Sequence, residues 1–191
     1  AQHAAEAIET EVIGVVKAGT TAAYANAKAN RNLLDSNDKV DMDDILAQVT
    51  TLRNNDAADI KGLFRALVSA NVVEQLMKDS AFRSAIQFQK DYLFTGTIAE
   101  LFGVAFQFSS LAPTVTNSGS NNAVANVEQT IIVGSNSYGI TKWMLNDYDI
   151  VYTKPGGWGD EWAVKHAMTW KYMFKSVILN QNWLLRLESS R

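Results

Sequence analysis

The sequence predicts an α+β fold, with helices in its first half and strands toward its end. Apolar residues recur every three or four positions from Met42 to Leu52, which is the period of an amphipathic helix. Bulky residues occupy alternate positions from 164 to 174, which is the period of a β-strand. The chain has 191 residues, of which 47% are hydrophobic and 19% charged. This is a globular composition, long enough to bury a sizeable core.

Residues 4–33 predict a long helix. Ile8, Val12 and Val16 fall on one helical face, and the alanine-rich stretch 22–29 extends the pattern. Gly19 works against the helix, since a glycine costs about 1 kcal/mol relative to alanine inside one. We expect this helix to pack against a sheet formed by the C-terminal strands.

The clearest helix of the chain begins after Asp41, whose side chain is expected to cap it. The apolar run at 63–68 then predicts a short buried strand. Asn71 followed by Glu74 has the spacing of a capping box, so another helix is expected to start there. A second short helix is expected over 79–86.

Glycines and polar residues divide the middle of the chain. Gly96 and Gly103 are predicted to bracket a compact turn that leads into a strand over 104–108. Residues 112–126 are rich in Asn, Ser, Thr and Gly and predict a long flexible loop. They offer little apolar surface to offset the cost of ordering the backbone, about 1–2 kcal/mol per residue. The β-branched residues at 129–133 predict the next strand.

From residue 149 onward the pattern is that of strands. A strand over 150–152 is expected to stop at Pro155, and a long strand over 164–174 has one bulky and one basic face. A turn at 180–182 precedes a final strand over 183–187. The lysines of the basic face are Lys165, Lys171 and Lys175.

Few residue patterns in this sequence point to catalysis. There are no cysteines, and neither a phosphate-binding loop nor a G-x-S-x-G nucleophile elbow occurs. His3 and His166 lack ligand partners at metal-binding spacing. His166 is expected to pack or to form a hydrogen bond, with a pH-sensitive subunit contact as the alternative. We therefore expect no catalytic residue, no cofactor and no metal site.

An acidic cluster lies around the start of the helix at Met42. Its carboxylates are expected to cap that helix or to be solvated, with weak cation binding as the alternative. The cluster consists of Asp35, Asp38, Asp41, Asp43 and Asp44.

The net charge of −3 argues against a nucleic-acid binder that works through an overall basic surface. No apolar run reaches the length of a membrane span. Aromatic residues are concentrated near the C-terminus. They are expected to form core or subunit contacts, and stacking on single-stranded nucleic acid is the less favoured alternative. The packing or interface candidates are Trp170, Tyr172, Phe174 and Trp183.

Five segments follow one another along the chain: DMDDILAQVTTLRNN with LFRALVS, NVVEQLMKDSAFRSA, GTIAELFGVAFQFSSLAP, TIIVGSNSYGITKW and HAMTWKYMFKSVILNQNWLLRLESS. In this order they resemble the major capsid proteins of tailed bacteriophages, which have the HK97-type fold. Many relatives have a His-Pro pair where this chain has Ala70-Asn71. Complete members carry an N-terminal arm and an extended β-loop, neither of which is recognisable here. The chain is therefore expected to match the C-terminal part of the family.

The resemblance implies a spine helix over 1–40, an axial α/β subdomain over 41–148, and returning strands of a peripheral β-sheet over 149–191. It implies a structural subunit, not an enzyme, that forms pentamers and hexamers of an icosahedral shell. The implied partners are other copies of the chain, scaffolding or decoration proteins, and packaged DNA through non-specific contact, with no membrane. The implied location is the host cytoplasm during assembly and then the virion capsid. The loop over 112–126 is then expected to adapt between five-fold and six-fold rings or to become ordered only on contact with a neighbour, and a plain solvent loop without a partner is the alternative.

Two other functions compete with a phage capsid. A nanocompartment shell protein of the same fold, which encloses a cargo enzyme, is the first alternative. A small hydrolase or nucleotide-binding enzyme is the second, and the missing motifs disfavour it.

Overall fold

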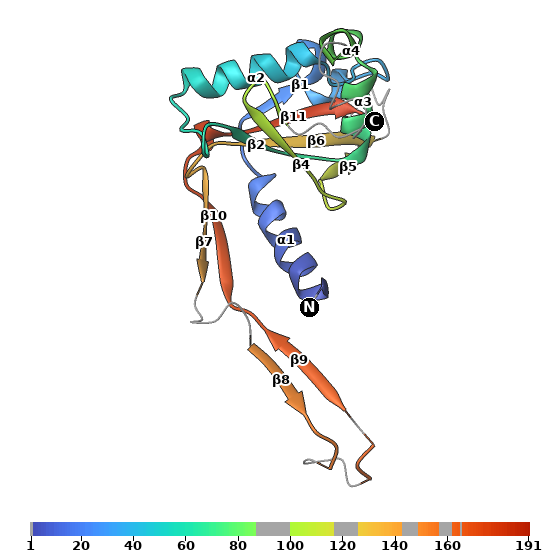
Figure 1. The fold of residues 1–191 in the computed structure, drawn as a ribbon, viewed down its shortest axis with the longest axis vertical. Coiled ribbons are helices and arrows are strands. Elements are labelled where there is room, and N and C mark those ends of the chain that lie inside the picture. Colours follow the sequence, from blue (N-terminus) through green and yellow to red (C-terminus); the bar gives the residue numbers. More distant parts are fainter. Residues whose placement is uncertain (1, 87–99, 117–125, 143–148, 157–161, 165) are drawn as a thin grey trace.

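The computed structural model describes residues 2–86, 100–116, 126–142, 149–156, 162–164 and 166–191. Its body is a seven-stranded mixed sheet in the order β1-β11-β6-β2-β4-β3, with β5 paired to β6 (Figure 1). Helices pack on both faces of this sheet. The strands are β1 (Ala22–Tyr24), β2 (Phe64–Val68), β3 (Glu100–Leu101), β4 (Val104–Phe108), β5 (Thr114–Thr116), β6 (Asn126–Val133) and β11 (Leu184–Ser190).

The N-terminal helix α1 (Gln2–Val16) is shorter than predicted. Beyond it the chain turns at Gly19, where an added Cβ would lie only 2.6 Å from the Leu184 side chain. The alanine-rich stretch that was expected to extend the helix instead forms β1, which pairs in parallel with β11. It continues as two 3₁₀ turns, η1 (Ala25–Ala27) and η2 (Arg31–Leu33). The prediction of one helix over 4–33 was wrong, because pairing with a distant strand outweighs the helix propensity of alanine.

Helices α2 (Met42–Asn54), α3 (Ala70–Lys78) and α4 (Ser80–Ile86) confirm the predictions for this region. Asp41 caps α2 as expected, since its carboxylate accepts a hydrogen bond of 2.8 Å from the Asp44 backbone. The cap of α3 is Ser69 and not Asn71. The core lies between α2, α3 and one sheet face, and includes Ile45, Leu52, Leu76, Ile132, Leu185 and Leu187.

The predicted strands over 63–68, 104–108 and 129–133 are confirmed as β2, β4 and β6. The turn before β4 places Phe102 at a φ of 52° and Gly103 at a φ of 80°, where glycine is unstrained. Gly96 lies outside the described residues. The predicted loop over 112–126 is partly wrong, because β5 pairs with the start of β6 from Thr114 to Thr116. Residues 117–125 lie outside the described part.

Two hairpins extend from the body of the protein (Figure 1). Strands β7 (Tyr138–Lys142) and β10 (Phe174–Ile178) form one antiparallel pair, and β8 (Asp149–Thr153) and β9 (Ala167–Lys171) form the other. The predicted single strand over 164–174 is therefore two strands. The chain changes pairing partner at Tyr172 and Met173, which belong to neither. The last strand begins at Leu184, after the 3₁₀ turn η3 (Gln181–Trp183), and not at Trp183.

The main sheet combines strands from all three of the predicted subdomain ranges. Strand β1 comes from 1–40, β2 to β6 come from 41–148, and β11 comes from 149–191. Strand β11 lies between β1 and β6, where it pairs with Val127–Val133 over seven residues. The last residues of the chain thus return to the body and do not join the hairpins.

Candidate assembly surface

The two hairpins carry most of the large apolar side chains that the described residues expose. Patches of exposed apolar surface mark sites of interaction with other molecules. We call this set of side chains the apolar hairpin surface. It consists of Tyr138, Ile140, Ile150, Val151, Tyr152, Trp162, Val164, Met168, Trp170, Met173, Val177 and Leu179.

One face of the β8–β9 hairpin is almost wholly apolar. Ile150 lies opposite Trp170, and Tyr152 lies opposite Met168. Directly paired residues project from the same face of a sheet, so these four side chains form one exposed stripe. The Tyr152 hydroxyl lies 3.0 Å from Nδ1 of His166. This contact gives His166 the hydrogen-bonding role that the sequence predicted.

The predicted packing candidates lie in three places. Trp170 is 43% exposed on the β8–β9 hairpin, so of the two predicted roles, core packing and subunit contact, only a subunit contact is compatible with its position in a single copy. Tyr172 and Phe174 lie at the junction of the hairpins with their ring centroids 4.8 Å apart. Trp183 lies at the end of the body, where its Nε1 donates a hydrogen bond of 3.0 Å to the Asn55 carbonyl. An interface role for the four residues stays a prediction.

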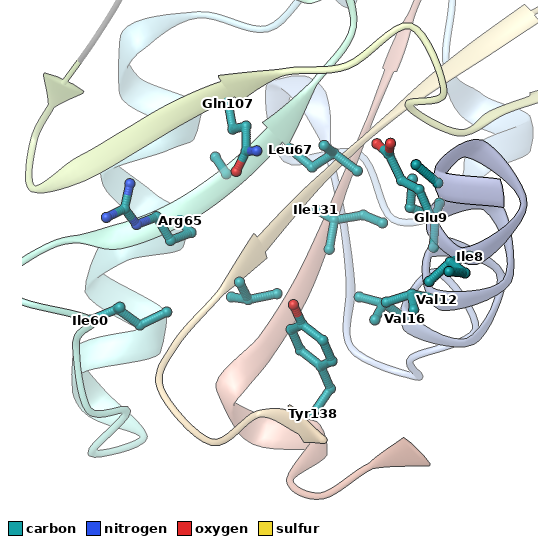
Figure 2. A pocket seen from close by; sticks show the side chains of 14 residues that line it. Ile8, Glu9, Val12, Val16, Ile60, Arg65, Leu67, Gln107, Ile131 and Tyr138 are labelled. Carbon is teal, nitrogen blue, oxygen red and sulfur yellow. The ribbon is translucent and has the colours of Figure 1, made fainter. Parts of the chain in front are cut away.

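A groove runs between α1 and the sheet face opposite α2 (Figure 2). Val12 and Val16 of α1 pack with Ile131 of β6 and close one side of it. Its volume is about 530 Å³. The lining is mainly apolar, with Arg65 and Gln107 on one side and Glu9 on the helix side. We call this site the α1 groove. The remaining residues that line it are Ala5, Ile8, Ile13, Ile60, Ala66, Leu67, Val133 and Tyr138.

A buried ion cluster ties the η2 segment to β11, an interior strand of the sheet next to the edge strand β1. Glu188 of β11 is fully buried, and its two oxygens accept hydrogen bonds of 2.6 Å from Nε and Nη2 of Arg31. Gln129 donates a bond of 2.9 Å to the same carboxylate, and Nε of Arg186 lies 2.8 Å from it. Burial acts to raise the pKa of Glu188, but the hydrogen bonds from Arg31 and Gln129 and the nearby positive charges lower it below its usual value.

Sequence reasoning missed this cluster. The signal was available in part, because Arg186 and Glu188, two residues apart in one strand, place opposite charges on the same face of it. A buried charge is retained only with partners. The identity of those partners is not local information, since Arg31 lies 157 positions away in the sequence.

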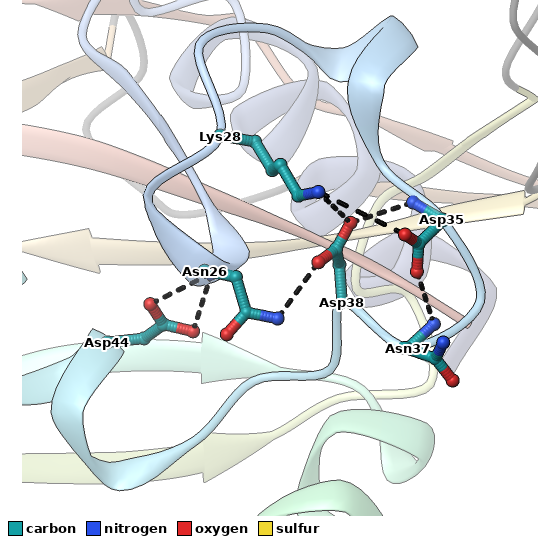
Figure 3. Close-up of polar contacts among 6 residues, drawn as sticks. All are labelled: Asn26, Lys28, Asp35, Asn37, Asp38 and Asp44. Atoms are coloured by element: carbon teal, nitrogen blue, oxygen red, sulfur yellow. Dashed lines mark hydrogen bonds and ion pairs between the residues drawn. The ribbon is translucent and has the colours of Figure 1, made fainter.

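Carboxylates of the acidic cluster form hydrogen bonds and ion pairs that fix the loop before α2 (Figure 3). The Asp38 carboxylate accepts bonds of 2.9 Å from Asn26 Nδ2 and 2.8 Å from the Asp35 backbone, and Lys28 Nζ lies 3.5 Å from it. Burial acts to raise the pKa of Asp38, but these partners lower it below its usual value. The Asp44 carboxylate accepts from the Asn26 backbone, and burial with the charge of Asp41 raises its pKa to about 6.

Asp41 therefore has the predicted capping role, but Asp38 is buried and neither caps the helix nor is solvated, so the prediction was wrong for that residue. No group of three or more His, Cys, Asp or Glu side chains suited to a metal ion occurs among the described residues. Within the same ranges, no helix combines the length and the apolar character needed to cross a membrane.

Comparison with known proteins supports the fold at low sequence identity. No protein-family model matches the chain, and no curated protein sequence matches it. A structure titled "Acidic stable capsid structure of Helicobacter pylori bacteriophage KHP30" superposes with a TM-score of 0.66 at 11% identity over 97% of this chain. A structure from Mycobacterium phage Che8 superposes with a TM-score of 0.65 at 12% sequence identity over 97% of this chain. The capsid of Ralstonia phage GP4 superposes with a TM-score of 0.63 at 12% sequence identity over 90% of this chain.

The chain therefore has the HK97-type α+β fold of phage capsid proteins, as its sequence resemblance implied. It spans only part of those proteins, namely 65% of the KHP30 chain, 61% of the Che8 chain and 53% of the GP4 chain.

Proposed function

We propose that this chain is a structural subunit of a tailed-phage capsid, which assembles with copies of itself into the icosahedral shell that encloses packaged DNA. The observation that carries the proposal is the HK97-type fold, in superpositions that include at least 90% of the chain. The apolar hairpin surface supports it independently. A two-stranded hairpin with an exposed apolar face is stabilised when another surface covers that face.

The proposed role is that of a structural protein and not of an enzyme. Its partners are other copies of the chain in pentamers and hexamers, with scaffolding or decoration proteins as further candidates. Non-specific contact with DNA is proposed for the exposed side chains of Lys171 and Lys175. Lys165 lies outside the described residues. Assembly in the host cytoplasm and final location in the virion capsid follow from the same proposal.

We also propose a revised division of the chain. The axial part consists of the main sheet with α2, α3 and α4, and the peripheral part consists of α1 and the two hairpins. This division keeps β1 and β11 with the strands to which they are hydrogen-bonded. It moves β7 to the peripheral part with its partner β10.

Electron microscopy of the purified, expressed protein tests the proposal. Closed particles or curved sheets made of pentamers and hexamers support a shell subunit, and a protein that stays monomeric at every concentration contradicts it. A nanocompartment shell of the same fold is distinguished by what the particles enclose. Particles purified from the native source contain DNA if the proposal is correct and a single cargo enzyme if it is not.

A further inference from the structure

The β7–β10 hairpin has one covered face and one open face. Ser176 is buried, and Ile178 packs against the apolar cluster that contains Val16 of α1, so both lie on the covered face. Successive side chains of a strand point to opposite faces of a sheet. Lys175 and Val177 alternate with these residues and therefore lie on the face turned away from α1. We call this the outer face of the hairpin.

The outer face combines exposed apolar side chains with positive charge. Val177 is 46% exposed, and Leu179, just beyond the end of β10, is 62% exposed. Leu179 belongs to the same face, because a Cβ added at Gly139, which pairs with Val177, would lie 3.3 Å from the Leu179 side chain. Lys175 is exposed and has no ion-pair partner among the described residues. Since β7 and β10 contain no Asp or Glu, the outer face is apolar and basic.

Helix α1 has the opposite charge. It contains Glu6, Glu9 and Glu11 and neither lysine nor arginine. Glu9 accepts a hydrogen bond of 2.6 Å from the Ser109 hydroxyl of its own copy. Glu11 is exposed, and its carboxylate has no partner within the described ranges. Ala7, one helical turn before Glu11, is exposed as well, so this side of α1 is open and negative.

Lys175 and Glu11 do not pair within one copy, because Lys175 points away from α1. We propose that the outer face of the β7–β10 hairpin of one copy receives α1 of a second copy, with Lys175 paired to Glu11 and with Val177 and Leu179 covered by the helix. The inference rests on the proposed function, because it identifies a contact by which copies join. Charge selects this occupant over the outer face of another hairpin, which would bring lysines together.

The contact has the geometry that a shell needs. Each β7–β10 hairpin would lie between two helices, its own α1 on one face and α1 of the second copy on the other. A two-stranded hairpin is marginally stable alone, so covering its second face stabilises it. The two surfaces differ, and such a heterologous contact closes into rings or continues as an open array. Use of Lys175 in this contact leaves the proposed DNA contact to Lys171, on the β8–β9 hairpin (Figure 1).

Exchanging the two charges tests the inference, because both side chains are exposed and each can be reversed without disturbing the core. Lys175→Glu and Glu11→Lys should each reduce the yield of particles about tenfold in buffer without DNA, since like charges then face each other. The double variant restores the ion pair in the reverse sense and should return the yield to within about twofold of the unaltered protein. The Tm of each variant should be unchanged.

The matched control is Lys154→Glu, at an exposed lysine just beyond the end of β8. This change alone should leave the yield of particles unaltered. Combined with Glu11→Lys, it should leave the yield as low as that of Glu11→Lys alone, because the like charges of Lys175 and the new lysine still face each other.

A double variant whose yield stays low would overturn the inference. A normal yield for Glu11→Lys alone would also overturn it, since any loss in Lys175→Glu would then belong to another contact of that lysine. In both cases particles formed by the unaltered protein would leave the proposed function standing. If the unaltered protein forms no particles under any condition, the proposed function and the inference fail together.

Discussion

Replacing Arg31 by alanine removes two of the short hydrogen bonds to the buried Glu188 carboxylate. Breaking a buried ion pair from one side costs about 3–5 kcal/mol, because the remaining charge stays buried without its partner. Arg186 and Gln129 still contact the carboxylate, and the Arg31 side chain is 32% exposed, so the expected loss is smaller. We expect the free energy of unfolding to fall by about 2–3 kcal/mol. This corresponds to roughly 4–12 °C in Tm for a chain of this size.

The pH dependence of this effect has a defined sign. The pKa of Glu188 is lowered in the folded protein, so its contribution to stability is complete above the unfolded value of about 4.5 and is lost as the pH falls through the folded value. Urea unfolding followed by tryptophan fluorescence should therefore show a large difference between R31A and the unaltered protein at pH 7 and a smaller one below pH 4.5.

K17A, at an exposed lysine, is the control and should change stability by less than about 0.5 kcal/mol. A loss below about 0.5 kcal/mol for R31A, or a loss that is the same at pH 7 and pH 3.5, would refute this account of the cluster.

Three further predictions follow from the same contacts. In thermal unfolding, Asp41→Ala should lower the free energy of unfolding by about 1 kcal/mol, because the α2 cap is lost. The control Asp43→Asn should lower it by only about 0.3 kcal/mol. Equal losses in the two variants would contradict the capping role of Asp41. Trp170→Ala should change the free energy of unfolding of the subunit by less than about 1 kcal/mol but reduce the yield of particles about tenfold. The control Thr169→Ala, on the other face of β9, should leave the yield of particles unchanged. Normal assembly of the Trp170 variant would exclude an interface role. The described part of the predicted loop, residues 112–116, should exchange amide hydrogens more slowly in particles than in free subunits, and equal exchange in both states would exclude adaptation to a neighbour.

Local patterns in the sequence were sufficient for the elements that rest on local physics. The cap at Asp41 and the apolar repeat after it specify α2, because both signals act within one or two turns. Alternation in β4 and the β-branched run in β6 identified those strands for the same reason.

The errors occurred where distant pairing decides the structure. The alanines at 22–29 predicted a helix. Residues 22–24 instead pair with β11, which lies more than 160 residues later in the sequence. Bulky side chains alternate without interruption through β9 into the start of β10, so the sequence predicted a single strand. The two strands are separate only because the pairing partner changes from β8 to β7. The α1 groove brings together side chains from α1, β2, β4 and β6, so no window of the sequence contains its signal.

The central claim is that this chain builds a shell through its own surfaces, and cryo-electron microscopy of particles formed by the purified protein tests it most directly. The account predicts closed particles or curved sheets in which each subunit shows the mixed sheet in the order β1-β11-β6-β2-β4-β3 and the apolar hairpin surface is covered by neighbouring copies. Monomers under all conditions, or particles in which both hairpins remain exposed to solvent, would contradict it.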